Sequence, residues 1–110
     1  MPTVRSSMSP VIIIEAPRRL DAAAAPAFGS FAVSLVEAGA HRVILDFSAV
    51  TYLGSVGLRA LMSIRKALIS HDGRLTLMAC HPAVAEVLRI CGLKNDLTLV
   101  ESIEEARQSV

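Results

Sequence analysis

Residues 46–61 constrain the fold of this chain more than any other segment. They follow an apolar run at residues 43–45, cross a polar bend, and place Ser55 between two glycines before a helical apolar pattern begins at Leu58. This order predicts a buried strand, a loop and a helix, with Ser55 at or near the helix N-cap. A strand followed directly by a helix favours a parallel sheet, in which a helix crosses over between neighbouring strands.

Strands and helices alternate along the rest of the chain. Short apolar or alternating runs predict strands at residues 11–15, 42–46, 74–80 and 97–100, with a candidate edge strand at residues 3–7. Apolar residues at helical spacing, with prolines near the starts and glycines near the ends, predict helices at residues 26–39, 58–69, 82–92 and 103–108. Residues 18–21 are expected to form a turn. The predicted fold class is α/β, with a mixed but mostly parallel sheet of four to five strands and about four helices.

The length of 110 residues predicts a single domain spanning residues 1–110, in which residues 1–9 form an edge strand or a flexible N-terminus. The net charge of +1 and the 4% aromatic content disfavour a nucleic-acid partner, since neither a basic field nor stacking platforms are present. The apolar runs are too short to span a membrane, and residues 1–10 do not resemble a signal peptide. We therefore expect a cytoplasmic protein. No long apolar stripe is left unassigned, which favours a monomer.

Cys80 and Cys91 lack the spacing of a metal or redox motif, and both lie in apolar surroundings. Buried free thiols in a reducing compartment are expected, in preference to a disulfide. Together with His41, His71 and His81 they lack zinc-ligand spacing, so no metal is predicted. The chain contains neither a P-loop nor a GxGxxG motif, and no cofactor is predicted.

Ser55 does not resemble a catalytic nucleophile. A hydrolase elbow reads G-x-S-x-G, but here Gly54 directly precedes the serine. A nucleophilic serine also needs an oriented base, and no histidine has a reason to converge on it. We expect no enzymatic activity. Ser55 is instead either a simple helix cap or an exposed hydroxyl that accepts a phosphoryl group, whose charge the start of a helix tolerates.

Residues 46–50, Ser55, Gly57, Leu58 and Leu61 together resemble the signature of STAS domains, specifically the anti-sigma factor antagonists. The resemblance extends over residues 10–108. Supporting matches are Leu20, Asp21, Pro26, Phe28, residues 73–75, Pro82, Val84, Leu88, Gly92, Leu93 and residues 102–106. The resemblance implies a STAS-like version of the predicted fold.

The resemblance also implies a function. In that family an anti-sigma factor that is also a serine kinase binds the unphosphorylated antagonist, and phosphorylation of a serine at the position of Ser55 blocks the binding. The resemblance implies this kinase as the partner, and it is compatible with a phosphatase as a second partner. The partner-binding residues that it implies are Asp21, Asp46, Gly54, Ser55, Val56, Gly57 and Leu58.

Three positions depart from the family pattern. Gly54 replaces an aspartate, Val56 replaces a second serine, and Arg18 replaces a glycine. Val56 is expected to fill space under the loop, and Asp46 to form a local turn at least as readily as a partner contact. Asp21 is equally suited to a turn or an interface. The departures keep a second hypothesis open, a STAS accessory subunit of a lipid-transport ATPase or larger signalling complex that is not phosphorylated.

Overall fold

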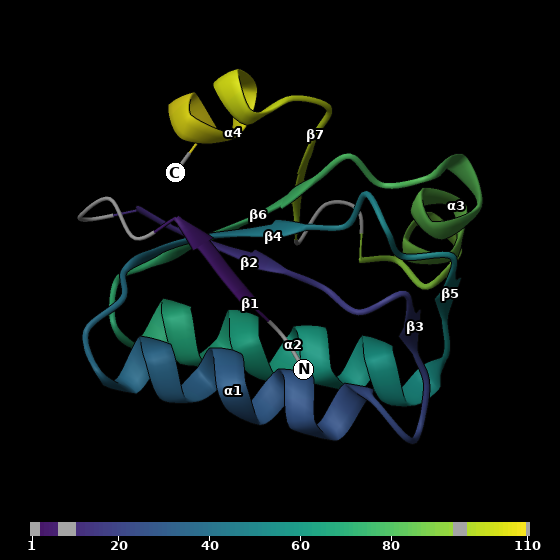
Figure 1. The fold of residues 1–110 in the computed structure, drawn as a ribbon, viewed down its shortest axis with the longest axis horizontal. Helices are drawn as coiled ribbons and strands as arrows, with labels where there is room; N and C mark the ends of the chain where they lie inside the picture. The colour runs from purple at the N-terminus through teal and green to yellow at the C-terminus, as the bar shows by residue number, and fades with distance from the viewer. Residues whose placement is uncertain (1–2, 7–10, 94–96, 110) are drawn as a thin grey trace.

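The computed structural model describes residues 3–6, 11–93 and 97–109, which build a five-stranded sheet with helices on both faces (Figure 1). The strands are β1 (Thr3–Ser6), β2 (Val11–Glu15), β4 (Arg42–Asp46), β6 (Arg74–Met78) and β7 (Thr98–Val100), in the order β1-β2-β4-β6-β7. The last four are parallel and β1 is antiparallel to β2. This confirms the mixed, mostly parallel α/β fold. Positions 1–2 and 7–9 of the predicted N-terminal segment lie outside the described residues.

The helices are α1 (Ala25–Glu37), α2 (Ser55–Ser70), α3 (Pro82–Ile90) and α4 (Ile103–Ser109). In Figure 1, α1 and α2 lie side by side beneath the sheet, α4 lies on the other face, and α3 lies at one end near β5. Pro26 occupies the first turn of α1, and Gly39, just beyond its end, has a φ of 119°, which favours glycine. Both features were predicted. Helix α2, however, begins at Ser55, three residues before the apolar pattern at Leu58.

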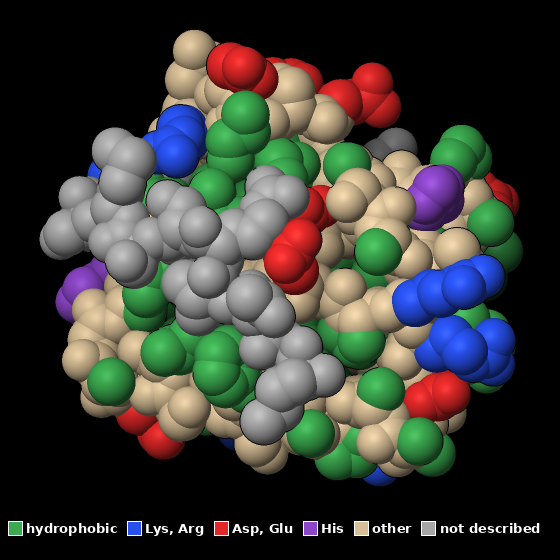
Figure 2. Space-filling model, in the orientation of Figure 1, with side chains coloured by type: hydrophobic (Ala, Val, Ile, Leu, Met, Phe, Trp, Pro, Cys, Tyr) green, Lys and Arg blue, Asp and Glu red, His purple; other side chains and the backbone are tan. Residues whose placement is uncertain are grey.

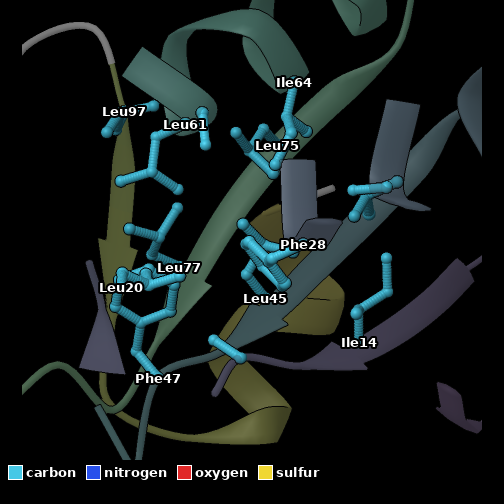
Figure 3. Close-up of a cluster of buried hydrophobic side chains, with 14 of the residues drawn as sticks. Ile14, Leu20, Phe28, Leu45, Phe47, Leu61, Ile64, Leu75, Leu77 and Leu97 are labelled. Atoms are coloured by element: carbon cyan, nitrogen blue, oxygen red, sulfur yellow. The ribbon is translucent and has the colours of Figure 1, made fainter. Parts of the chain in front are cut away.

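Alternation of side chains along the strands divides the core between the two faces. Ile14, Leu45 and Leu77 point toward α1 and α2, where they pack with Phe28 and Ile64 (Figure 3). On the other face a smaller cluster of buried residues packs between the sheet and α4. It consists of Val11, Ile13, Ile44 and Met78 from the strands and Ala106 from α4. Burial on both faces explains why the central strands read as continuous apolar runs.

A second, two-stranded parallel sheet joins two loops at one end of the molecule. It pairs β3 (Arg19–Leu20) with β5 (Tyr52–Leu53), in the register Arg19 to Tyr52 and Leu20 to Leu53. The prediction that residues 18–21 form a turn was therefore wrong. A strand of two residues carries no periodic pattern, and this one is held by the burial of Leu20 and Leu53 rather than by local preference.

Two further predictions fail at Ala79, Cys80 and Cys91. Strand β6 ends at Met78, because Ala79 turns out of the sheet with a φ of 61° while its N–H donates to the Val100 carbonyl at 2.9 Å. Both thiols are free, as expected, but Cys80 is only partly buried and Cys91 is exposed just beyond the end of α3. An apolar neighbourhood in sequence did not place Cys91 inside the core. Among the described residues, no helix has the length and apolar character needed to cross a membrane.

Candidate functional site

Three loops meet at the carboxyl edge of the parallel sheet, where Glu15, Asp46 and Met78 end their strands in register. The loop before α1 is joined to the loop before α2 by the β3–β5 pairing and by the Thr51 N–H, which donates to the Arg18 carbonyl at 2.8 Å. The loop before α3 joins them through His81, whose Nε2 donates to the Ser48 carbonyl at 2.8 Å. Ligand sites of open α/β sheets gather at this edge. The three loops form one continuous surface.

Ser55 is the first residue of α2 and its side chain is exposed. The N-cap is Gly54, in an extended conformation (φ −99°, ψ −174°), and no side chain caps the helix. Among the described residues, none makes a hydrogen bond to the Ser55 hydroxyl. The interpretation of Ser55 as a helix cap is therefore wrong. None of the residues in the first turn is acidic, so the positive end of the helix dipole faces no carboxylate there.

The start of α2 lies tightly against the β3–β5 pair. A Cβ atom added to Gly57 would stand 2.6 Å from the Leu20 carbonyl oxygen and 2.7 Å from Leu53 Cδ1, so only glycine fits without a shift. Val56 and Leu58 are half-buried and pack against the main core. The packing role expected of Val56 agrees with this contact, whereas its place under the loop stays a prediction. Gly57 is buried, so it allows the close approach of the helix and offers no exposed surface of its own.

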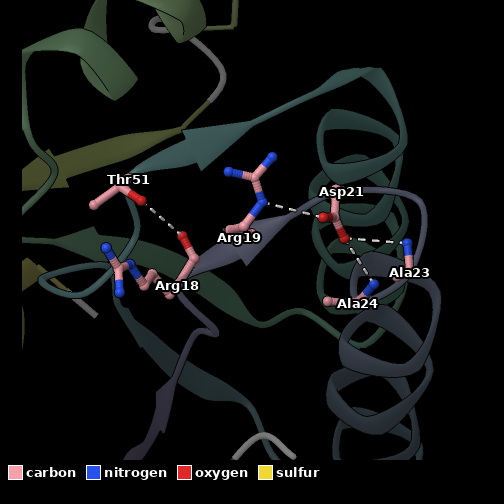
Figure 4. A network of polar contacts seen from close by, with 6 residues as sticks. All are labelled: Arg18, Arg19, Asp21, Ala23, Ala24 and Thr51. Carbon is pink, nitrogen blue, oxygen red and sulfur yellow. Dashed lines mark hydrogen bonds and ion pairs between the residues drawn. The ribbon is translucent and has the colours of Figure 1, made fainter.

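Asp21 organises the loop that leads into α1 (Figure 4). Its Oδ1 accepts hydrogen bonds from the N–H groups of Ala23 at 3.1 Å and Ala24 at 3.0 Å, and Arg19 Nε donates to Oδ2 at 3.3 Å. The bond from Ala24, followed by the contact with Arg19, lowers the pKa of this carboxyl below its ordinary value. Asp21 thus forms the turn and remains partly accessible.

Asp46 lies beneath the surface, 3% exposed at the end of β4. Its Oδ1 accepts a hydrogen bond from the Ser48 N–H at 2.9 Å, which confirms its role as a turn former. At this depth it shapes the bend that leads to β5. Its predicted contact with a partner stays a prediction.

Tyr52 is the site residue that sequence analysis missed. The phenol ring lies over Gly54, so that a Cβ atom added there would stand 2.8 Å from the Tyr52 hydroxyl oxygen. On the ring, the guanidinium carbon of Arg19 lies 4.6 Å from the centroid, a cation–π contact. Only the pairing of residues 19 and 52 could have pointed to Tyr52. Strands of two residues leave no pattern in the sequence from which such a pairing could be predicted.

The described residues assemble neither a catalytic triad nor a metal centre around Ser55. His41 Nδ1 donates to the His71 carbonyl at 3.0 Å, at the end of the molecule where α2 finishes. No group of three or more His, Cys, Asp or Glu among the described residues could hold a metal ion. A shallow groove of about 420 Å³ runs between α1 and α2, and its walls include Pro26, Val56 and Arg59.

Comparisons with known proteins agree on one family. A model of the STAS domain matches residues 4–106. The protein BtrV of Bordetella bronchiseptica, named as a candidate anti-sigma factor antagonist, is 35% identical over 71 residues, which cover 64% of this chain and 61% of that relative. The match thus spans less than two thirds of the relative's length.

Solved structures share the fold over nearly the whole chain. An anti-sigma factor antagonist from Mycobacterium paratuberculosis is 25% identical with a TM-score of 0.86, covering 100% of this chain and 92% of that one. The antagonist SpoIIAA in its unphosphorylated form is 20% identical with a TM-score of 0.83, over 98% and 94% of the two chains. Its phosphorylated form from Bacillus is 19% identical with a TM-score of 0.75, over 98% and 97%.

Proposed function

Because the chain belongs to the STAS domain family, we propose that it is an anti-sigma factor antagonist whose binding to an anti-sigma factor is switched off by phosphorylation of Ser55. The observation that carries the proposal is Ser55 itself, exposed at the first position of a 16-residue helix with its hydroxyl free of hydrogen bonds among the described residues. The names of BtrV and of the two structural relatives support the choice of partner.

A phosphoryl group at this position adds charge without demanding a new fold. It brings about −1.5 to −2 charges at neutral pH and three acceptor oxygens. The first N–H groups of a helix have no intrahelical acceptors, and the dipole favours an anion there. Arg59 lies one turn further along α2, within reach of a side chain four residues before it. The phosphate is therefore accommodated within the chain, while a partner seated on the same helix end meets its bulk and charge.

The proposed partner surface is built in two layers. The outer layer consists of exposed Ser55, with half-buried Asp21, Gly54, Val56 and Leu58 beside it. Beneath it, Asp46 and Gly57 set the shape of the loop and the seat of the helix. In this mechanism the protein performs no chemistry. A kinase that is also the anti-sigma factor adds the phosphate, and a phosphatase that removes it restores binding.

The test is to incubate the protein with ATP and each serine-kinase anti-sigma factor of its source organism, and to map the phosphate by mass spectrometry. One kinase is expected to modify the wild type at Ser55 and to leave Ser55→Ala unmodified. Ser55→Glu is expected to bind that kinase at least about tenfold more weakly than the wild type, because the mimic places a charge in the interface.

The matched control is Ser70→Glu, which puts the same charge at the exposed far end of α2. It is expected to bind within about twofold of the wild type, since rim or distant charges contribute little. Equal binding of Ser55→Glu and wild type would overturn the proposed switch. Capture of a transport ATPase instead of a kinase-type anti-sigma factor would favour the accessory-subunit hypothesis.

A further inference from the structure

Tyr52 stands out on the surface beside Ser55. The described residues include three large apolar side chains that are exposed, namely Tyr52 at 43%, Ile69 at 53% and Ile90 at 68%. Ile69 and Ile90 lie near the ends of their helices, whereas Tyr52 lies three residues from Ser55 and reaches back over the N-cap Gly54. A partly exposed tyrosine next to a candidate regulatory residue is a candidate anchor for a partner, because tyrosine is enriched among the residues that dominate binding energy.

Two residues contact the Tyr52 ring, which sets it apart from an ordinary surface tyrosine. Arg19 lies across from Tyr52 in the parallel register and stacks on the ring, and Asp21 pairs with Arg19 at 3.3 Å. Gly54 also lies beside the ring, since a Cβ atom added there would stand 2.8 Å from the hydroxyl oxygen and 3.2 Å from Cε2. Binding through Tyr52 would therefore cost little side-chain entropy, because the ring is already positioned.

We propose that Tyr52, clamped by its contacts with Arg19 and Gly54, is the residue by which the Ser55 surface selects its protein partner, and that position 54 is glycine so that the ring can lie there. The inference rests on the proposed function. Tyrosine and arginine are the side chains most often found at the energetic centre of an interface. Here they form one stack, and no side chain at position 54 separates that stack from Ser55.

The clamp also defines the chemistry of the partner. Arg18 and Arg19 are both exposed, and Figure 2 shows basic side chains gathered at the end of the molecule where Figure 1 has β3 and β5. The partner is therefore a protein that offers an apolar slot for a phenol ring, bordered by carboxylates that face the two arginines. A phosphate on Ser55 would stand beside the phenol and draw the Arg19 guanidinium toward itself, which would loosen the stack.

The chain provides its own reporter, since Tyr52 is its only tyrosine and it has no tryptophan. Intrinsic fluorescence therefore follows this one ring. In the protein alone, Gly54→Ala is expected to displace the ring and raise its quenching by acrylamide, while Gly29→Ala, whose added Cβ meets Ala60 and not Tyr52, leaves the quenching unchanged. Unchanged quenching in Gly54→Ala would overturn the clamp. Circular dichroism identifies any variant that has unfolded.

Partner selection is tested with the anti-sigma factor that phosphorylates Ser55. Tyr52→Ala and Gly54→Ala are expected to weaken its binding at least about tenfold, as for the truncation of a central aromatic. Tyr52→Phe is expected to stay within a few-fold because it keeps the ring and the stack. Ile90→Ala removes a large apolar side chain that is more exposed than Tyr52 and lies elsewhere, and it is expected to bind like the wild type.

The outcomes separate the inference from the function beneath it. If Ser55→Glu abolishes binding and Tyr52→Ala binds like the wild type, Tyr52 does not select the partner and the inference fails while the function stands. If neither variant alters binding, the proposed function fails. If Ile90→Ala weakens binding as much as Tyr52→Ala, the contact is a general apolar one and the assignment to Tyr52 is overturned.

Discussion

At the scale of single residues, Thr76 is an exception to the pairing of buried polar groups. It lies in the middle of β6, 1% exposed, and its hydroxyl has no hydrogen-bond partner within the part of the chain that the structure describes. Its neighbours in register are Ile44 on β4 and Thr98 on β7. A buried hydroxyl without a partner costs about 1–3 kcal/mol of desolvation.

Thr76→Val is therefore expected to raise the free energy of unfolding by about 1 kcal/mol, since it keeps the branched shape and removes the unpaired hydroxyl. Urea denaturation followed by circular dichroism measures the change. Thr98→Val, at the exposed neighbour, is the control and is expected to alter stability by less than about 0.5 kcal/mol. A loss of stability in Thr76→Val would mean that the hydroxyl is satisfied in solution.

The two cysteines differ in chemistry as a consequence of where they lie. Partial burial disfavours the thiolate of Cys80 and raises its pKa to about 11, from an ordinary 9.0. At pH 8 this leaves about a hundredfold less thiolate than an unperturbed thiol would have. Cys91 is exposed.

Alkylation by iodoacetamide at pH 8 is therefore expected to modify Cys91 rapidly and Cys80 at least about tenfold more slowly, with the rate at Cys80 still rising as the pH passes 9 toward 11. Peptide mass spectrometry over time separates the two sites. Cys91→Ser is expected to remove the fast reaction. Equal rates at the two thiols in the folded protein would contradict the burial of Cys80.

At the scale of elements, the β3–β5 pair and the first turn of α2 act as one unit. Gly54 N–H donates to the Leu20 carbonyl at 3.2 Å, and Gly57 lies against the same carbonyl. The position of Ser55 is thus set by contacts with residues more than thirty positions earlier in the chain. The helix start is fixed by tertiary packing more than by its own capping, since no side chain caps it.

Gly57→Ala is expected to destabilise the fold by about 1–3 kcal/mol, because the added methyl meets backbone that cannot move independently. Gly29→Ala is the matched helical control, since its Cβ would stand 3.1 Å from Ala60 Cβ and the better helix propensity of alanine, about 1 kcal/mol, offsets the crowding. Thermal and urea unfolding compare the two. If Gly57→Ala and Gly29→Ala had similar stability, the tight packing of α2 against β3 would be contradicted.

At the scale of the whole molecule, local signals predicted the main architecture. The apolar runs of β2 and β4 have the predicted bounds, because both faces of these strands are buried. Two helices start near a proline and end just before a glycine, namely α1 with Pro26 and Gly39 and α3 with Pro82 and Gly92. These residues restrict or free the backbone locally, so they can be interpreted from the sequence alone. At the start of α4, the Glu105 N–H donates to Ser102 Oγ at 3.3 Å, so a local side chain caps this helix.

The predictions failed where distant segments decide the outcome. Arg19 and Tyr52 pair across 33 positions, and neither the pairing nor the stacking of Arg19 on the tyrosine ring leaves a local pattern. Ala79 makes the last hydrogen bond to β7, from its N–H to the Val100 carbonyl, and its backbone then turns away with a φ of 61°, although the sequence continues the strand pattern. Within the site, residue types alone predicted the candidate serine, the turn at Asp21 and the bend at Asp46. The contacts around Tyr52 could not be predicted without knowledge of the fold.

The pairing of Arg19 with Tyr52 and of Leu20 with Leu53 also makes chain length part of the site. Five residues separate β4 from β5, and successive strand residues point to opposite sides. One inserted residue would bring Tyr52 into the buried place of Leu53 and turn a leucine outward. A one-residue insertion between Asp46 and Tyr52 that shifted this register would therefore exchange the inner and outer faces of this edge, so the length of the loop shapes the site together with its side chains.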